Sequence, residues 1–407
     1  MLCAKCKGRG WCGKPCIILS RIKHWKATIE NIKKDLYVNT PPACFVGRHS
    51  YPNVYYGILA PYEHKDNAEL YDYPELWFNQ KLSIEEILNY RAQMVYSRRR
   101  DNVKRQSKYL EITQEIVCSK KSVDLEIYLK NRPRLSFSFN AYTLPIGNPA
   151  RVKDLRLASN PKIEKTVDKV VSDYDLKAND AIFMLYEDGL EISKIQRILS
   201  LGLLGVKSQR KMVPTRWAWT AVHSTIGNEL LREVKSFEKI SSYLVFNAEY
   251  LGNHFEVLLL PDVYQYELIE VKYPGSVWNL LGSKPLIFKN YESHFGLKKY
   301  AEETAGAFYA ARLACLEYLR KIRRQASVLV VREVYSSYYA PLGVWIVENT
   351  VREAFKNKET FENLEEALNA MAYRLKAGDR FVRQSKLLKI FRTQHKLDAF
   401  SNKILEN

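Results

Sequence analysis

The sequence predicts an α+β fold in which helices mix with mostly antiparallel strands. Hydrophobic residues make up 46% and charged residues 27% of the 407 residues, which is a globular composition. Helical and strand patterns both occur, without the regular alternation of a parallel α/β fold. From length and patterning we expect a four-cysteine zinc knuckle, a large α+β domain, a smaller α+β domain and a basic tail, at residues 1–20, 21–285, 286–380 and 381–407.

Hydrophobic spacing and turn residues place the individual elements in order. Apolar residues three and four apart predict helices at residues 17–35, 83–100, 161–173, 190–204, 300–324 and 362–376. Alternation with β-branched and aromatic residues predicts strands at residues 40–52 (with a turn), 109–130, 134–144, 240–272 and 326–333. Ser83 and Glu86 form a capping-box pattern at the start of one of these helices.

Four cysteines fall close together near the N-terminus, with the spacing C-x2-C-x5-C-x3-C: Cys3, Cys6, Cys12 and Cys16. This spacing can bring four thiolates around one tetrahedral ion, and nearby glycines allow the tight loops that this requires. Because four protein thiolates leave no open coordination position, we predict one structural Zn²⁺ per chain. An iron–sulfur cluster, which also takes four cysteine ligands, is the alternative.

The remaining cysteines and the N-terminal residues indicate the compartment. Cys44, Cys118 and Cys315 are scattered singly, which argues against a disulfide framework. The first residues lack the apolar core of a secretory signal, and no apolar run approaches the ~18 residues of a membrane span. We therefore expect a cytoplasmic, nucleoid-associated protein without a membrane partner.

The charge balance is strongly basic. Sixty-three Lys and Arg against 45 Asp and Glu give a formal net charge of +18. Such an excess suits a polyanionic partner, although a generally basic proteome would give the same composition. The positive residues concentrate in 1–35, 98–108 and 374–407, and clusters of this kind suit phosphates better than an even spread would.

Six blocks of the sequence, in order, resemble one family. The N-terminal cysteine motif is similar to the zinc motif of the archaeal Nre DNA-repair proteins. The other similar blocks are Phe45–Pro52, Val213–Val222, Leu251–Val257, Ala310–Ala314 and Pro341–Trp345. The resemblance implies a role in DNA-damage repair and, for members with a suitable C-terminal tail, attachment to the sliding clamp, PCNA. It implies no settled reaction, and His223 stands where the family pattern has an acidic residue.

Arginines in basic clusters and in Pro-flanked, turn-like motifs are the candidate DNA-binding residues. Arginine gives a phosphate a bidentate, permanently charged partner, while pairing with a buried carboxylate is the structural alternative. Trp217 and Trp219 could stack on unpaired bases or belong to the core. The candidates are Arg48, Arg98, Arg99, Arg100, Arg105 and Arg216.

Two other functions remain open at this point. A nuclease-like arrangement, in which two carboxylates hold Mg²⁺ or Mn²⁺ and a lysine orients water, is resembled by Asp262, Glu270 and Lys272. The simpler interpretation is that these residues are solvated charges on a strand. Further carboxylates in apolar settings could bind a metal together: Glu249, Glu267, Glu317 and Glu333. No residue is assigned a catalytic role. RNA binding or processing would use the same basic and aromatic features.

The C-terminal tail carries a candidate clamp-binding box. Gln394, Leu397 and Phe400 follow the form Q-x-x-L-x-x-F, in which the glutamine fills a polar pocket and the apolar pair fills a hydrophobic one. An upstream register from Gln384 to Phe391 also fits. We rank it second, because its apolar residues form an ordinary amphipathic stripe that would pack on the domain.

Overall fold

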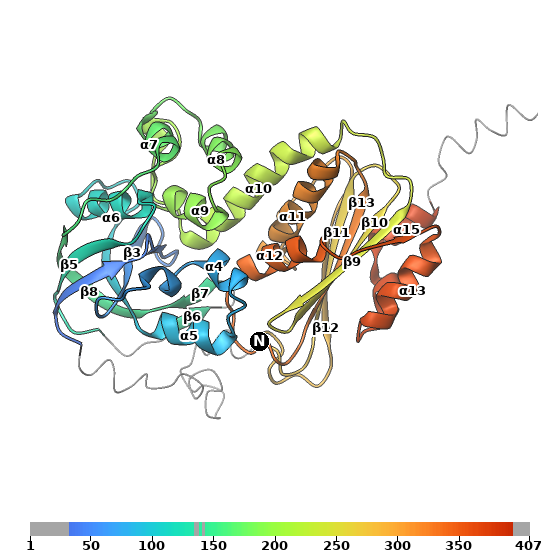
Figure 1. Cartoon of the computed structure of the whole chain (residues 1–407), viewed down its shortest axis with the longest axis horizontal. Helices are drawn as coiled ribbons and strands as arrows, with labels where there is room; N and C mark the ends of the chain where they lie inside the picture. Colours follow the sequence, from blue (N-terminus) through green and yellow to red (C-terminus); the bar gives the residue numbers. More distant parts are fainter. Residues whose placement is uncertain (1–31, 134–137, 141–142, 394–407) are drawn as a thin grey trace, which may run out of the picture.

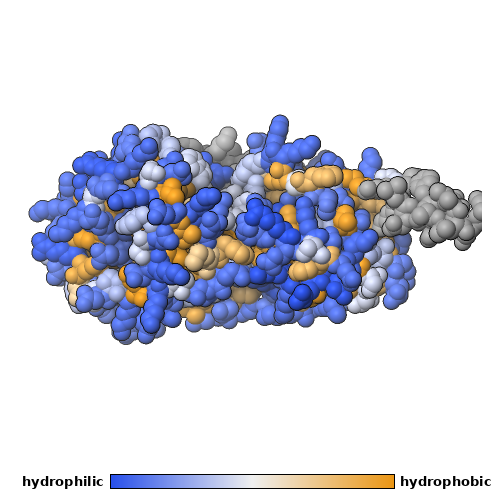
Figure 2. All heavy atoms as spheres, turned by 90° about the horizontal axis from the view of Figure 1, so that it is seen from above, coloured by the Kyte–Doolittle hydropathy of each residue, from blue (hydrophilic) through white to orange (hydrophobic). Residues whose placement is uncertain are grey.

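The computed structural model describes residues 32–133, 138–140 and 143–393 of the chain. These residues form two six-stranded mixed sheets, with a layer of helices between them (Figure 1). The α+β prediction is confirmed, whereas the predicted knuckle at residues 1–20 lies outside the described residues. The face seen in Figure 2 is mostly hydrophilic, with apolar residues in small separate patches.

The first sheet has the strand order β1-β5-β8-β4-β3-β2. Its strands are β1 (Asp35–Thr40), β2 (Cys44–Val46), β3 (Asn53–Pro61), β4 (Met94–Asn102), β5 (Val123–Leu129) and β8 (Asn148–Leu157). Neighbouring strands are antiparallel except β4 and β8, which are parallel. A small antiparallel pair, β6 (Ser138–Asn140) and β7 (Thr143–Ile146), lies between β5 and β8 in the sequence.

The helix α5 (Ile84–Ala92) begins at the predicted capping box, in which the reciprocal hydrogen bonds of Ser83 and Glu86 are both present. The predicted end of this helix is wrong, because the chain turns at Gln93 and continues as β4. The arginines at 98–100 therefore lie on a strand that pairs with β3. Two short helices precede α5, namely η1 (Ala68–Tyr71) and α4 (Pro74–Asn79).

The segment predicted as one strand at 109–130 is a helix, α6 (Lys108–Cys118), followed by β5. The Ser107 side chain caps α6 by accepting a hydrogen bond from the Leu110 N–H. The β-branched composition favoured a strand, but the buried residues are spaced three and four apart, as on one helical face: Tyr109, Leu110, Thr113, Ile116 and Val117. The helical period and the cap outweigh composition here.

Helices α7 (Lys165–Ser172), α8 (Ala178–Glu187) and α9 (Ile192–Ser200) lead through a short turn, η2 (Lys207–Gln209), to the long helix α10 (Thr215–Val234). Figure 1 shows α10 running from the first half of the molecule to the second. It packs against α8 and α9 on one side and against α11 (Gly306–Ile322) of the second half on the other. Its fully buried residues recur every four positions: Ala218, Val222, Ile226, Leu230 and Val234.

The second sheet has the strand order β12-β11-β13-β10-β9-β14, and only β11 and β13 run parallel. Its strands are β9 (Tyr243–Tyr250), β10 (Asn253–Leu260), β11 (Gln265–Lys272), β12 (Leu286–Glu292), β13 (Ser327–Val334) and β14 (Lys358–Phe361). The sheet thus combines strands from both sides of residue 285.

Helices cover both faces of the second sheet (Figure 1). On one face, Phe246, Phe255 and Val257 join the large core that contains α10 and α11, and α12 (Trp345–Ala354) lies over β9 and β10. The alternate residues, such as Leu258, face a second core. Three C-terminal helices contribute to that core: α13 (Leu364–Arg374), α14 (Arg380–Gln384) and α15 (Lys386–Thr393). No helix of the described residues is both long and apolar enough to cross a membrane.

Candidate nucleic-acid interface

A cavity of about 1070 Å³ opens beside α10, and we call it the α10 groove. One wall is formed by α10 residues spaced three and four apart, on a different side of the helix from its buried stripe: Arg216, Trp217, Thr220, Ala221, Ser224, Asn228, Leu231 and Arg232, with Lys235 just beyond the helix. The other wall is the segment 295–300, which joins β12 to α11, together with the start of α11. From Arg216 to Arg232 the helix rises about 24 Å.

The structure brings Arg48 and Arg216 to the same groove, although they are far apart in the sequence. The backbone N–H of Val46, at the end of β2, donates to Thr215 Oγ1 at the start of α10 over 2.9 Å. The rings of Tyr51 and Trp217 also meet, with centroids 5.1 Å apart. These contacts hold the turn between β2 and β3 against the first turn of α10. Arg216 therefore lies in a helix, and its prediction as part of a turn-like motif was wrong.

The lining of the groove carries a strong excess of positive charge. Its one acidic residue, Glu292, binds the buried Arg312 of α11 over 2.6 and 2.9 Å, so this pair is neutral. In contrast, the exposed Arg48, Lys298 and Lys299 form no ion pair with any other residue that the structure describes. Cations left without carboxylates around a concavity attract polyanions.

A glycine allows the Glu292–Arg312 pair to form beneath the groove. A Cβ atom at Gly227 of α10 would lie 2.8 Å from a guanidinium nitrogen of Arg312. The small residue therefore lets α10 and α11 approach closely while Arg312 stays buried between them.

The four predicted arginines on and after β4 divide into two pairs. Arg99 and Arg105 bind the buried Asp101 over 3.1 and 3.0 Å, so they match the structural alternative while their side chains remain 44% and 60% exposed. Arg98 and Arg100 instead lie over the ring of Tyr55, with their guanidinium carbons 4.3 and 6.0 Å from its centroid. Residues two apart on a strand share a face, which explains this division of the β4 positions.

Sequence reasoning missed several basic residues that the fold adds to these two surfaces. Lys298 and Lys299 line the α10 groove opposite Arg216, and the sequence signal would have been the adjacent Lys-Lys-Tyr triplet. Arg151 of β8 pairs in register with Arg98, which extends the cluster beside Tyr55 to a third strand. Arg151 and Arg98 become neighbours through the pairing of β4 with β8, which the local sequence does not indicate.

His223 occupies the buried side of α10 and does not line the groove. Its Nε2 lies 2.6 Å from Glu348 Oε2 on α12, and the half-buried Trp219 stacks on its ring. Burial acts to raise the pKa of the Glu348 carboxyl, but Arg352 and His223 together outweigh it and lower that pKa. A histidine here can pair with Glu348, whereas an acidic residue would place a second carboxylate beside it.

The nuclease hypothesis does not fit the geometry of β11. Glu270 is buried and binds Lys272 over 2.8 Å and Arg332 over 2.5 Å, so both of its oxygens already face cations. The interpretation of these residues as solvated charges is also wrong, since Lys272 is only 8% exposed. Asp262 precedes β11, and the strand advances about 16 Å between Gln265 and Glu270, so the two carboxylates do not share an ion.

Burial and ion pairing have opposing effects on Glu270. Burial acts to raise its pKa, while the attraction of Lys272 and Arg332 is stronger and leaves the pKa below its ordinary value of 4.5. The carboxylate is therefore ionised at neutral pH, and the three residues form a buried charged cluster that lines a cavity together with the start of α11.

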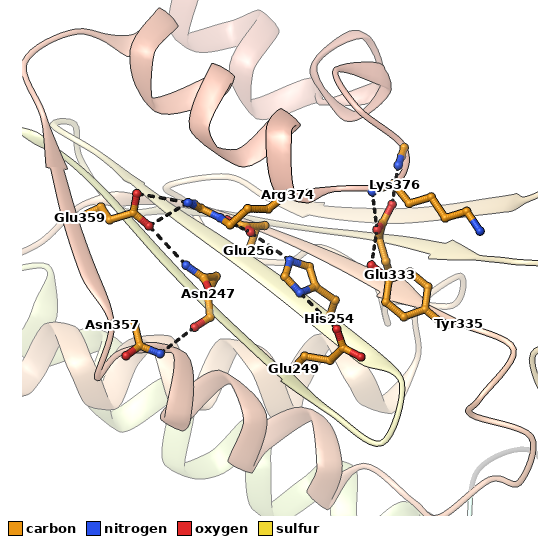
Figure 3. A network of polar contacts seen from close by, with 11 residues as sticks. Asn247, Glu249, His254, Glu256, Glu333, Tyr335, Asn357, Glu359, Arg374 and Lys376 are labelled. Carbon is orange, nitrogen blue, oxygen red and sulfur yellow. Dashed lines mark hydrogen bonds and ion pairs between the residues drawn. The ribbon is translucent and has the colours of Figure 1, made fainter.

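Two of the glutamates considered as metal ligands, Glu333 and Glu267, hold the C-terminal helices on the sheet, and Figure 3 shows the first of them. Glu333 of β13 accepts hydrogen bonds from the hydroxyls of Tyr273 and Tyr335, and from the backbone N–H groups of Lys376 and Ala377 beyond α13. All four of these bonds span 2.6 to 2.9 Å. The buried carboxylate thereby satisfies polar groups that burial would otherwise leave unpaired.

Glu256 of β10 and Glu267 of β11, the two strands that flank β13, also hold C-terminal helices on the sheet. Glu256 binds Arg374 of α13 over 2.8 and 2.9 Å and also contacts His254 over 2.9 Å (Figure 3). Glu267 accepts from the Ser385 hydroxyl and from the N–H groups of residues 386 and 387 at the start of α15.

The expectation that these carboxylates assemble around a metal is not met. Glu317 lies elsewhere, bound to Arg352 over 2.7 and 2.8 Å, while Glu249 stands 3.8 Å from His254. Within residues 32–133, 138–140 and 143–393, no group of three or more His, Cys, Asp or Glu side chains could hold a metal ion.

The predicted zinc ligands Cys3, Cys6, Cys12 and Cys16 lie outside the described residues, as do Gln394, Leu397 and Phe400 of the tail. The upstream clamp-box register does lie within them. Leu387 and Leu388 of α15 are buried in the core beneath the C-terminal helices. They are therefore part of the fold, which leaves the downstream register as the candidate.

A two-sheet α+β fold whose central helix lines a basic groove defines a class of protein suited to bind a polyanion. The N-terminal model of the archaeal Nre family matches residues 11–279, and its C-terminal model matches residues 292–400. The chain therefore belongs to the archaeal Nre family, and the resemblance noted in the sequence is confirmed.

Its relatives include proteins from two archaea. The chain is 41% identical to DNA repair protein NreA of Archaeoglobus fulgidus, with 92% of this chain and 93% of the relative covered. It is 37% identical to DNA repair protein NreB of the same organism, with 90% and 92% covered. It is also 37% identical to DNA repair protein NreA of Haloferax volcanii, with 82% of each covered. No solved structure matches the chain.

The charged cluster at Glu270 predicts a pH-dependent stability difference. At pH 7, Glu270→Gln should lower the free energy of unfolding by about 3–5 kcal/mol, because it leaves Lys272 and Arg332 buried without a countercharge. Since the folded-state pKa of Glu270 is lowered, its contribution is full above pH 4.5 and is lost as the pH falls through that pKa. Urea unfolding at pH 7 and at acidic pH measures the difference.

The matched control is Glu365→Gln, whose side chain is 70% exposed. This variant should stay within about 0.5 kcal/mol of the native chain at both pH values. A Glu270→Gln penalty that is equally large at acidic and neutral pH would contradict the assignment.

Proposed function

We propose that this Nre-family chain acts in DNA repair by binding DNA in the α10 groove. The observation that carries the proposal is the convergence of Arg48, Arg216, Lys298 and Lys299 on one cavity from three separate parts of the chain. The relatives in two archaea are named DNA repair proteins, which supports DNA as the polyanion.

The electrostatics of the groove support phosphate binding. The Glu292–Arg312 pair is neutral, and Arg232 near the end of α10 pairs with Glu229. The exposed Arg48, Lys298 and Lys299 retain their full charge toward a ligand. Neutralising a phosphate releases counterions, which makes the affinity depend steeply on salt. Arg98, Arg100 and Arg151 would provide a second positive surface, on the first sheet, for a longer piece of DNA.

Removing three exposed groove cations should weaken DNA binding and reduce its salt dependence. For Arg48→Ala with Lys298→Ala and Lys299→Ala, we expect a lower affinity and a flatter plot of log K against log salt. Its slope should shrink by about 0.7–0.9 for each phosphate that the variant no longer neutralises. Fluorescence anisotropy across a salt series measures both quantities. The three side chains are exposed, so thermal unfolding should be unchanged.

The control is Arg383→Ala on α14, a side chain that is 74% exposed and belongs to the group of helices on the other face of the second sheet. Its affinity and salt slope should equal those of the native chain. If the triple variant keeps the native slope, DNA does not bind in the α10 groove.

We also propose that Cys3, Cys6, Cys12 and Cys16 hold one structural Zn²⁺, which supports the proposed function by folding an N-terminal segment that has nine Lys or Arg among residues 1–35. The support is the cysteine spacing and its likeness to the family's zinc motif.

Elemental analysis of the purified chain should give about one zinc per chain. Cys3→Ala with Cys6→Ala should lose this zinc, because two thiolates cannot complete the tetrahedral site. Cys44→Ala and Cys118→Ala are the controls and should keep the zinc. Both thiols are buried, and neither belongs to a group of described residues that could hold a metal ion. Unchanged zinc in the double cysteine variant would refute the site.

Docking on the sliding clamp PCNA through Gln394, Leu397 and Phe400 is the third part of the proposal. These residues follow directly after α15, whose start is fixed by the bonds of Glu267 to Ser385 and to the backbone beyond it. Arg392 and Lys396 lie next to and within the box and would steer it toward an acidic partner.

Calorimetry of the full chain with the clamp tests this assignment. Leu397→Ala with Phe400→Ala should abolish the binding heat without changing the stability of the chain. Leu387→Ala should instead cost about 2–5 kcal/mol of stability, because it creates a cavity beneath α15, and should leave clamp affinity unchanged for the folded fraction. Native clamp binding by the tail double variant would show that the box does not dock on the clamp.

A further inference from the structure

Large aromatic side chains gather at the α10 groove without being buried. Trp217 and Tyr300 line it and are 44% and 46% exposed, and Phe295 lines it and is 94% exposed. Tyr51, which is 40% exposed, lies against Trp217. Of the seven exposed aromatic residues among those described, three line this one cavity and a fourth, Tyr51, lies against one of the three. Scattered exposed apolar residues are normal on a protein surface, whereas such a gathering marks a binding site.

Both walls of the groove present aromatic rings. On the α10 wall, the rings of Tyr51 and Trp217 are 5.1 Å apart and tilted by 54°. On the other wall, Tyr300 stacks on Tyr309 with centroids 5.5 Å apart and an angle of 24°. Phe295 stands on the same wall, shortly before the lysines at 298 and 299. Aromatic rings and cations thus line the same groove.

This combination selects for one form of nucleic acid. In a duplex, each base face is covered by the neighbouring base pair, so protein rings in a groove have nothing to stack on. In a single strand the base faces are available, and stacking on aromatic side chains adds affinity without requiring a particular sequence. Lysine and arginine along the same path hold the phosphates.

We propose that the α10 groove binds single-stranded DNA, with bases stacked on Trp217 and Phe295 and phosphates held by the cations between them. This inference rests on the proposed DNA-binding function and specifies its substrate. A strand exposed at a gap, an end or an unwound lesion has this form. The rise of α10 from Arg216 to Arg232, about 24 Å, would accommodate a short run of nucleotides.

Anisotropy of four fluorescein-labelled oligonucleotides of equal length tests the inference on the full chain. They are single-stranded DNA, a duplex of the same sequence, a single strand with abasic sites at all central positions, and the matched RNA. The native chain should bind single-stranded DNA more tightly than the other three.

The variant Trp217→Ala with Phe295→Ala should bind single-stranded DNA at least about 30-fold more weakly, because each of the two stacked bases contributes at least about 5-fold. It should bind the abasic strand and the duplex as the native chain does, because the phosphate contacts remain. The matched control is Tyr373→Ala on α13, an aromatic side chain that is 93% exposed away from the groove and should change nothing.

The possible results separate this inference from the proposed function. The single-strand assignment is overturned if the double aromatic variant binds single-stranded DNA as tightly as the native chain does, or if the native chain binds the duplex more tightly. In either case, a loss of affinity in the variant with Arg48→Ala, Lys298→Ala and Lys299→Ala still supports DNA binding. Tighter binding of RNA overturns the assignment to DNA. Absence of binding to all four oligonucleotides refutes the proposed function itself.

Discussion

The burial of one stripe of α10 determines the arrangement of the functional surface. Val222, Ile226 and Leu230 are fully buried among α8, α9 and α11, so the rotation of α10 about its axis is fixed by packing. This rotation places Trp217, Ser224 and Asn228 at the groove, while Thr225 and Glu233 contact α8 and α11. Because α10 spans both halves of the molecule, the same packing places the turn after β2 and the segment before α11 at one cavity.

The distribution of ion pairs explains where the excess positive charge is available. Three buried carboxylates of the second half have their partners inside the fold. Glu256 and Glu333 hold the C-terminal helices on the sheet, and Glu270 neutralises Lys272 and Arg332. Each would be costly to bury without these partners. The acids thus neutralise cations that are buried or that join elements together. Exposed cations such as Arg48, Lys298 and Lys299 have no carboxylate partner among the described residues, and theirs is the charge that a polyanion meets at the groove.

The sequence was sufficient for elements whose pattern is local and insufficient for those that depend on distant partners. The strands around 240–272 and 326–333 were predicted from their local runs of β-branched and aromatic residues, and the structure shows that β10, β11 and β13 are buried on both faces of the sheet. The helix α10 was missed because Pro214 suggested a turn, although proline also suits the start of a helix and the buried residues recur every four positions. The burial of Glu270 could not be read locally, since its partner Arg332 comes from another strand. Likewise, Arg48 and Arg216 were each singled out, but their proximity follows from the Val46–Thr215 bond.

The two faces of the second sheet separate the two proposed interactions in space. Successive residues of β10 point to opposite faces, so Val257 joins the core containing α10 and α11, while Leu258 joins the core beneath α13 and α15. The α10 groove therefore lies on the side of the first core, and the chain leaves α15 at Thr393 on the side of the second. Because a sliding clamp encircles the DNA on which it moves, this separation lets the chain be tethered at the clamp while the groove remains open to a strand of that same DNA.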